Sequence, residues 1–408
     1  MKEFNINQDN VLVSYHGPGG HVRVPDGVKS IGGGAFTFVD ALTIFQVVLP
    51  EGLETIGFRA FEGCALLTHV YLPSTLKTIE HNAFAGCTSL EKIKFPQGLE
   101  EIGEKAFYYC EKLESPVFPD TLKTIGNSAF QSCSALNEIA LQGSLETLGG
   151  AAFSRCISLK QVTLSSRLKT LPIWCFRDCF DLEQVSLPEG LETMEGGVFD
   201  GCGNLKEVNI PGSVHTIGGR AFADCISLPS AMALPAGLKK LGIDLFAGSS
   251  VQCFSMPEEV FASFSYRIFP GGNAGLAVQT ADSWRFYGFS AKSNRDVLTD
   301  YVRRGKWNSY DLQLLNNGPE YKFKTPARLL ASLGRLVDPV DLTDECKELH
   351  LEFLIKNAKK LIPIAEQLRC PAIVEAMKEH GIINDKNKKA IAKLLAASIV
   401  PEIASVQL

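Results

Sequence analysis

The sequence lacks the long apolar segments that place a chain across a membrane. No run in its 408 residues approaches the roughly 18 consecutive apolar residues that a membrane helix needs. No apolar stretch follows Lys2, where a secretory signal would carry one, and no Asn-x-Ser/Thr acceptor occurs. We therefore expect a cytoplasmic protein without a membrane span. The alternative is a surface or secreted protein exported without a visible signal peptide.

The sequence also lacks the residue patterns that carry catalysis. It has no Gly-x-x-x-x-Gly-Lys-Ser/Thr phosphate loop, no Gly-x-Ser-x-Gly elbow and no His-Glu-x-x-His pair among its 7 histidines. The formal net charge of -5 provides no overall basic character for nucleic acid. We expect no enzyme activity, no cofactor, no metal and no nucleic-acid partner.

What the sequence does contain is a phenylalanine that returns at a fixed interval. Seven of the nine spacings are 23 residues, the first is 25 and the last is 24, along the series Phe36, Phe61, Phe84, Phe107, Phe130, Phe153, Phe176, Phe199, Phe222 and Phe246. A period in the twenties with several aliphatic positions predicts a solenoid of stacked coils, because one coil cannot bury its apolar side alone.

Each repeat predicts one short strand and one bend. In the repeat that begins at Phe61, Val70 and Leu72 alternate with polar neighbours, as in a strand with one buried face, and Pro73 ends the strand. Glycines recur after the position of Ile79, where tolerance of a positive φ would let the chain bend: Gly103, Gly126, Gly149, Gly218 and Gly242.

The order Leu-x-x-Val-x-Leu-Pro, then Leu-x-x-Ile-Gly-x-x-Ala-Phe-x-x-Cys, over about residues 20–250 resembles the BspA-type leucine-rich repeat family. The resemblance implies a curved right-handed solenoid with a parallel sheet along its concave side. It also implies protein binding, often by bacterial surface or secreted proteins that meet host components. An adhesin or host-directed effector is therefore the alternative to an intracellular scaffold.

We expect four regions along the chain. Residues 1–24 form an N-terminal cap, a hairpin of Val11–Tyr15 and Val22–Val24, and residues 25–254 form a solenoid of about ten coils. Residues 255–289 form a packed aromatic junction, with a ligand pocket, or a catalytic site within 255–325, as the alternatives. Residues 290–408 carry amphipathic segments and form an all-α domain, whose last helices are similar to ankyrin-like pairs.

Eight of the 12 cysteines follow the repeating phenylalanine by three residues: Cys64, Cys87, Cys110, Cys133, Cys156, Cys179, Cys202 and Cys225. A column along a solenoid does not converge on one zinc ion, since successive coils lie ~4.8 Å apart. Thiols that point the same way into a core do not present the torsion of a disulfide. We expect reduced, buried thiols that pack as small apolar groups.

Charge alternates at the position seven residues before each repeating phenylalanine, along Lys29, Glu54, Lys77, Glu100, Lys123, Glu146, Lys169, Glu192, His215 and Lys239. We expect these side chains to stack as a column of opposite charges that disfavours a slip by one coil. The alternative is that the repeats were duplicated recently in pairs.

The exposed positions of the predicted strands differ between early and late coils. His69, Tyr71, Lys92 and Lys94 combine an aromatic side chain with cations, whereas later coils carry small, mostly uncharged side chains. We predict that these four residues are the centre of a contact patch for an acidic protein partner, with a merely solvated strand face as the alternative. The helical tail would add a second contact surface, and we expect a monomer.

Overall fold

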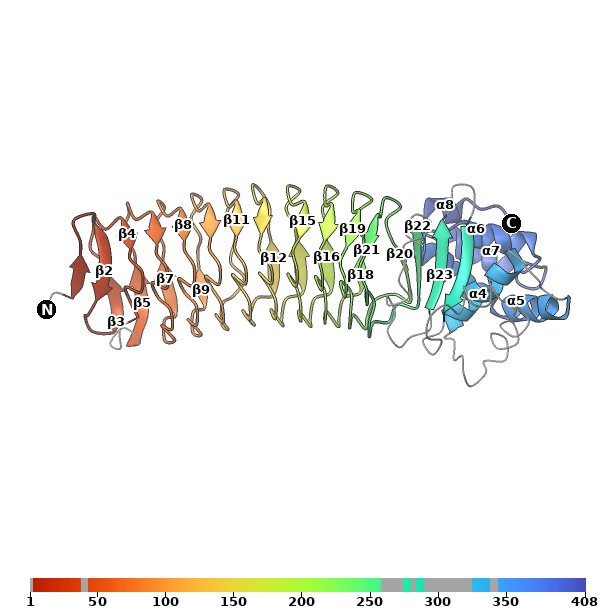
Figure 1. Cartoon of the computed structure of the whole chain (residues 1–408), viewed down its shortest axis with the longest axis horizontal. Coiled ribbons are helices and arrows are strands. Elements are labelled where there is room, and N and C mark those ends of the chain that lie inside the picture. The colour runs from red at the N-terminus through yellow and green to blue at the C-terminus, as the bar shows by residue number, and fades with distance from the viewer. Residues whose placement is uncertain (1–2, 38–42, 258–273, 280–283, 290–324, 338–343) are drawn as a thin grey trace. The chain divides into compact units, whose positions relative to one another are not determined.

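The computed structural model describes residues 3–37, 43–257, 274–279, 284–289, 325–337 and 344–408 (Figure 1). It contains a β-solenoid of about ten turns with parallel sheets and a helical C-terminal region, as the sequence predicts. The chain divides into two compact units, Met1–Ser227 and Leu228–Leu408, so the division falls before the predicted end of the solenoid at residue 254. The boundaries of the four predicted regions stay predictions.

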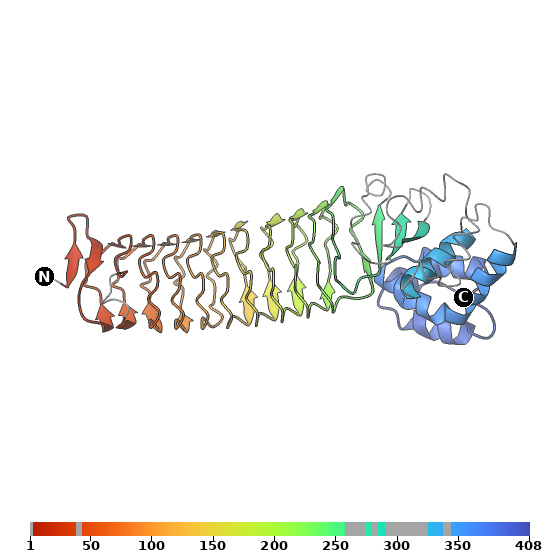
Figure 2. The same ribbon diagram turned by 60° about the horizontal axis from the view of Figure 1, so that its bottom comes forward.

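Most coils of the first unit contribute one strand to each of two rows (Figures 1 and 2). The first row contains the predicted strands: β3 (Gly20–Arg23), β5 (Ile44–Val48), β7 (His69–Tyr71), β9 (Lys92–Ile93), β12 (Glu138–Ala140), β14 (Gln161–Thr163), β16 (Gln184–Ser186) and β18 (Glu207–Val208). Neighbouring strands within each of its two sheets are parallel and in register, so equivalent residues of successive coils lie side by side.

A second row, which the sequence analysis missed, runs through the Ile79 position. It starts at β2 (Val11–Tyr15) and continues through β4 (Ser30–Ile31), β6 (Thr55–Ile56), β8 (Thr78–Ile79), β10 (Glu101–Ile102), β11 (Thr124–Ile125), β13 (Thr147–Leu148), β15 (Thr170–Leu171), β17 (Thr193–Met194) and β19 (Thr216–Ile217). After β2 these strands have two residues each, which is too short for a period-2 pattern to be recognised.

A proline interrupts each row once. In the first row Pro116 occupies the inward strand position between β9 and β12, and its nitrogen has no hydrogen to donate. The Ser115 hydroxyl instead accepts hydrogen bonds from the backbone N–H groups of Asn137 and Glu138, each at 3.0 Å. In the second row Pro172 follows β15, where β13 and β15 no longer pair. The two breaks fall between different coils, so each coil interface keeps at least one intact ladder.

The repeating phenylalanines form the core of the first unit. Successive rings from Phe36 to Phe222 are fully buried and stack with centroids 4.5 to 5.8 Å apart and interplanar angles of 2° to 19°. The Tyr15 ring lies 5.3 Å from Phe36 and 5.0 Å from Phe4. The aromatic column therefore begins in the cap, because each ring needs a neighbour on both faces.

The repeat cysteines bond to this same column. All eight are buried and unbridged, and each Sγ–H donates to the carbonyl oxygen of the phenylalanine one coil earlier, at 3.1 to 3.5 Å. For example, the Cys133 thiol bonds to the Phe107 oxygen at 3.1 Å. A small side chain with one donor fits this position, so the thiols contribute hydrogen bonds as well as apolar packing.

The predicted N-terminal hairpin is wrong. The strand β1 (Phe4–Ile6) is the antiparallel partner of β2, whereas β3 pairs in parallel with β5 in the other row. Val22 of β3 lies beside Val47 of β5, which lies beside Val70, so β3 is the first member of the buried valine column. For β3, extension of this buried valine column is favoured over a local hairpin with β2.

The reason predicted for the recurring glycines is also wrong. Gly126 and Gly149 do not have a positive φ; instead, a Cβ would lie 2.5 Å from the Glu104 nitrogen at Gly126 and 2.3 Å from the Asn127 nitrogen at Gly149. These glycines are required by close approach of the preceding coil. Positive φ angles occur two residues before and after the phenylalanine, as at Arg59.

The second unit contains a sheet and five described helices. The sheet consists of β20 (Ala231–Ala233), β22 (Cys253–Pro257), β23 (Ala274–Gln279) and β24 (Trp284–Phe289). The helices are α4 (Thr325–Val337), α5 (Asp344–Gln367), α6 (Ala372–Glu379), α7 (Lys388–Ala396) and α8 (Pro401–Ala404). Most of the predicted aromatic junction lies outside the described residues, as does the first part of the predicted all-α domain, residues 290–324.

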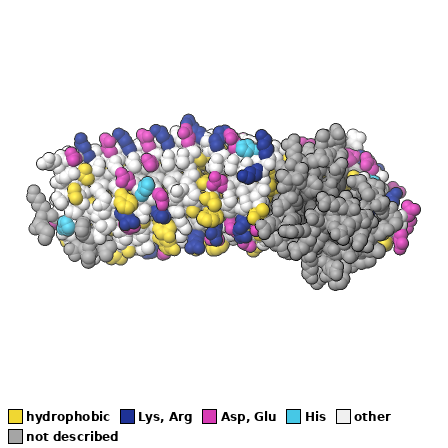
Figure 3. All heavy atoms as spheres, viewed as in Figure 1, with side chains coloured by type: hydrophobic (Ala, Val, Ile, Leu, Met, Phe, Trp, Pro, Cys, Tyr) yellow, Lys and Arg dark blue, Asp and Glu magenta, His cyan; other side chains and the backbone are white. Residues whose placement is uncertain are grey.

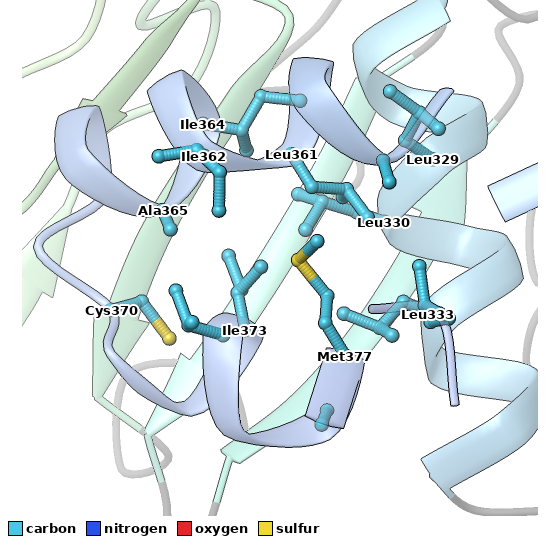
Figure 4. Close-up of a cluster of buried hydrophobic side chains, with 14 of the residues drawn as sticks. Leu329, Leu330, Leu333, Leu361, Ile362, Ile364, Ala365, Cys370, Ile373 and Met377 are labelled. Atoms are coloured by element: carbon cyan, nitrogen blue, oxygen red, sulfur yellow. The ribbon is translucent and has the colours of Figure 1, made fainter. Parts of the chain in front are cut away.

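Buried side chains from α4, α5 and α6 form the core of this unit (Figure 4). Leu330, Leu361, Ile373 and Met377 are fully buried there. The core extends to Ala231 of β20, whose backbone N–H donates to the Gln367 side chain at 3.1 Å. Helices and sheet therefore share one core within the second unit.

The buried thiols predict a loss of stability at alkaline pH. Burial raises the pKa of the Cys64 thiol to about 12 and raises the pKa of the other repeat thiols as well, whereas an unfolded cysteine titrates near pH ~8.5. Above that pH the unfolded chain releases these protons and the folded chain does not. We therefore expect the free energy of unfolding, measured by urea denaturation, to fall as pH rises from about 7 to about 10. For Cys133→Ala, the free energy of unfolding should fall less steeply with pH. Equal stability of the parent at about pH 7 and about pH 10 would contradict the assignment of these thiols as buried and protonated.

Close packing of the glycines predicts position-specific sensitivity. We expect Gly126→Ala to lower the free energy of unfolding by about 1–3 kcal/mol, because the added Cβ meets backbone that cannot move aside. The matched control is Gly98→Ala, where the nearest atom to the added Cβ lies at 3.4 Å and the change should stay within about 0.5 kcal/mol. Equal effects at both positions in urea denaturation would show that close approach is not the cause.

Candidate binding surface

The four residues predicted to bind a partner lie at neighbouring positions of the first row. His69 and Tyr71 are on β7, and Lys92 opens β9 in register with His69. Lys94 follows β9 directly. The Tyr71 side chain is 51% exposed, and both lysines are exposed. The fold thus brings these side chains together on one strand face, and partner binding by them stays a prediction.

Hydrogen bonds and ion pairs hold part of this surface in place. The Lys92 Nζ lies 3.4 Å from the Glu114 Oε2, and the His69 Nδ1 lies 2.9 Å from the Thr68 hydroxyl. Lys94 has no ion-pair partner in the part of the chain that the structure describes. Its charge is therefore available to a ligand.

Two more basic residues extend the surface, and sequence reasoning missed both. His21 and Arg23 lie on β3, where Arg23 is beside Val48, which is beside Tyr71, and His21 is beside Gln46, which is beside His69. The assumed hairpin concealed this relation, although the spacing of 25 residues from Val22 to Val47 equals that from Phe36 to Phe61. We call this surface the early basic face and define it as His21, Arg23, His69, Tyr71, Lys92 and Lys94.

The same face of the late coils has a different character. Its outward residues lie on β12, β14, β16 and β18 or directly after them, and they are Glu138, Ala140, Gln161, Thr163, Gln184, Ser186, Glu207 and Asn209. No lysine, arginine, histidine or aromatic residue occurs among these positions. The basic character is therefore confined to the early coils.

The alternating charges lie along one edge of the solenoid, where Figure 3 shows basic and acidic side chains in turn. The observed pairs are Lys77 with Glu54 (3.3 Å), Lys123 with Glu100 (2.6 Å), Lys169 with Glu192 (3.4 Å) and His215 with Glu192 (3.8 Å). Glu146 pairs instead with Arg167 outside the column, at 3.0 Å. The column therefore stacks as predicted, but it forms two separate pairs and one group of three around Glu192 rather than one continuous ladder.

Within the described residues, reactive groups are scarce. Burial raises the pKa of the repeat thiols, which leaves little thiolate to act as a nucleophile or a metal ligand. No group of three or more His, Cys, Asp or Glu side chains there is arranged to hold a metal ion. No helix in the described ranges is long and apolar enough to cross a membrane. The described surface offers area and charge for recognition.

The stacked coils with parallel strands define a leucine-rich repeat solenoid. Residues 19–133, 100–229 and 198–272 match the BspA type leucine rich repeat region, and together they cover more than half of the chain. The protein belongs to this family. No match exists among curated proteins.

Several solved structures are similar to the chain. A leucine-rich repeat protein from Bacteroides ovatus is 22% identical, with 68% of this chain and 97% of that chain covered and a TM-score of 0.42. The pneumococcal vaccine antigen PcpA is 22% identical over 63% of this chain and 80% of that chain, with a TM-score of 0.46. The T. pallidum leucine rich repeat protein is 28% identical over 55% and 87%, with a TM-score of 0.33.

The charge column predicts a salt-dependent contribution to stability. Glu100 lies between Lys77 and Lys123, and its hydrogen bond to Lys123 lowers the pKa of its carboxyl group. We expect Glu100→Lys to lower the melting temperature at low salt, because three positive charges would then be adjacent, and we expect the difference to shrink at high salt. Glu100→Gln removes attraction without adding repulsion, so its melting temperature at low salt should lie between those of the parent and Glu100→Lys. A variant as stable as the parent at low salt would contradict the assignment.

Proposed function

We propose that the protein is a non-enzymatic interaction scaffold that binds an acidic segment of a partner protein on its early basic face. The observation that carries this proposal is the combination of an exposed Tyr71 with cationic side chains on or directly after β3, β7 and β9 of one sheet. Tyrosine and arginine supply much of the binding energy in interfaces where a few residues dominate.

Electrostatics support an acidic partner. Residues 1–289 carry 21 Lys and Arg and 30 Asp and Glu, so this region has a negative net charge. A basic face within it is therefore a local exception. Complementary charge steers association and discriminates against basic competitors. The strand face is also held by the ladders on each side of β7, so little ordering entropy is lost on binding.

The cytoplasm is the proposed compartment. All 12 cysteines are free and buried in the fold, and in an oxidising compartment the newly made chain would expose these thiols before it folds. Isolation in the presence of an alkylating reagent followed by mass spectrometry is the test. Cross-linked repeat cysteines in the isolated protein would favour the exported adhesin or effector.

The binding proposal is tested with the full chain and two labelled peptides of equal length, one rich in Glu and Asp and one rich in Lys. We expect the acidic peptide to bind and the affinity to fall with added salt, as for a charged interface. Tyr71→Ala combined with Lys94→Glu should weaken binding by about tenfold or more, since an anchor and an unpaired charge are lost together. Fluorescence anisotropy measures both effects.

A matched control separates the site from overall charge. Tyr109→Ala combined with Lys160→Glu removes one partly exposed tyrosine and makes the same charge change elsewhere in the solenoid. This variant should bind as the parent does. Equal loss in both variants, or no preference for the acidic peptide, would overturn the early basic face as the site.

A further inference from the structure

An exposed apolar column lies on the late coils, away from the early basic face. The position directly after the repeat cysteine holds Ala65, Thr88, Glu111 and Ser134 in the early coils, then Ile157, Phe180, Gly203 and Ile226. The three large side chains of this second set are 42%, 51% and 67% exposed. We call Ile157, Phe180, Gly203 and Ile226 the late apolar column.

The column has a protruding side chain beside a hollow. Its members lie on successive coils, since the Asp181 nitrogen donates to the Ile157 oxygen and the Asn204 nitrogen to the Phe180 oxygen, both at 3.1 Å. Gly203 has no side chain, and a Cβ built there would meet only Ile226, at 3.8 Å. The half-exposed ring of Phe180 therefore lies one coil away from an open space at Gly203.

Charged residues border the column three positions further along the coils of Ile157, Phe180 and Gly203. They are Lys160, Glu183 and Lys206, and the Lys206 Nζ lies 2.5 Å from the Glu183 Oε2. An apolar centre with a polar border is the usual composition of a protein interface.

We propose that a second copy of this chain packs on the late apolar column, with the two solenoids antiparallel. A two-fold axis across the solenoid, between the coils of Phe180 and Gly203, sets Phe180 of one copy into the hollow at Gly203 of the other. It also sets Ile157 against Ile226. In the bordering positions it sets Glu183 of one copy against Lys206 of the other.

The order of residues favours this register over its neighbours. A slip by one coil in one direction sets Phe180 on Phe180 and Glu183 on Glu183, and a slip in the other sets Gly203 on Gly203 and Lys206 on Lys206. Parallel packing in register would place each residue of the late apolar column against the same residue of the other copy. Only the antiparallel arrangement centred between these two coils matches protrusion with hollow and opposite charges with each other.

The predicted dimer is weak and bivalent, in contrast to the monomer expected from sequence. Four coils with three large side chains provide an interface well below the roughly 800 Å² per partner of standard complexes. Antiparallel packing would place the early basic faces of the two copies at opposite ends of the paired late coils. A partner with two acidic segments would then bind with increased avidity.

Sedimentation equilibrium of the full chain, kept in a thiol reductant, tests the proposal across a wide concentration range. We expect a reversible monomer–dimer equilibrium. Phe180→Asp should abolish the dimer, and Gly203→Leu, which fills the hollow, should weaken it by about tenfold or more. Glu183→Lys alone should weaken the dimer, and Glu183→Lys with Lys206→Glu should restore it, because the reversed charges match again.

The control is Phe45→Asp, which changes a similarly exposed phenylalanine, 45% exposed, in an early coil. This variant should dimerise as the parent does, and the melting temperature of each variant establishes that it is folded. A parent that is monomeric at every concentration overturns the proposal. A dimer that survives Phe180→Asp, or fails to recover in the double charge reversal, overturns it as well.

Discussion

The structure depends on the contact that each repeating phenylalanine makes with the coils on either side. The Phe107 ring stacks on Phe84 and Phe130, its backbone N–H donates to the Ala129 oxygen at 2.7 Å, and its carbonyl accepts the Cys133 thiol at 3.1 Å. One residue thus satisfies packing and hydrogen bonding at once. A coil without a neighbour would lose all of these contacts together, which is why a solenoid gains stability from coil to coil.

This redundancy lets the rest of the coil vary. Pro116 and Pro172 each remove a ladder hydrogen bond, and the structure tolerates them because they fall at different coil interfaces. Outward positions carry no such constraint, so one column can be basic in early coils and uncharged or acidic in late ones. Recognition is therefore expected where the repeats differ, as at Tyr71 and Phe180, rather than where they agree.

The two proposed surfaces divide the first unit by coil number. Early coils present cations around an aromatic side chain, and late coils present an apolar column bordered by charge. Both lie on a backbone that hydrogen bonds fix on two sides of each coil, so neither needs a conformational change to form. Together, the two proposals describe a scaffold that pairs through one surface and binds a partner through the other.

The sequence by itself determined the period, the buried phenylalanine and cysteine columns, the first row of strands and the grouping of His69, Tyr71, Lys92 and Lys94. It could do so because a fixed repeat turns contacts between coils into fixed offsets along the chain. Only the tertiary structure decided the second row, the partner of β2, the thiol acceptor and the crowding at Gly126, and only it joined Arg23 to the early basic face. The crowding and the thiol acceptor depend on distances between backbones of different coils, which residue spacing does not encode. The spacing from Val22 to Val47 is compatible with the pairing of β3 and β5, but spacing alone did not exclude a local hairpin of β2 with β3.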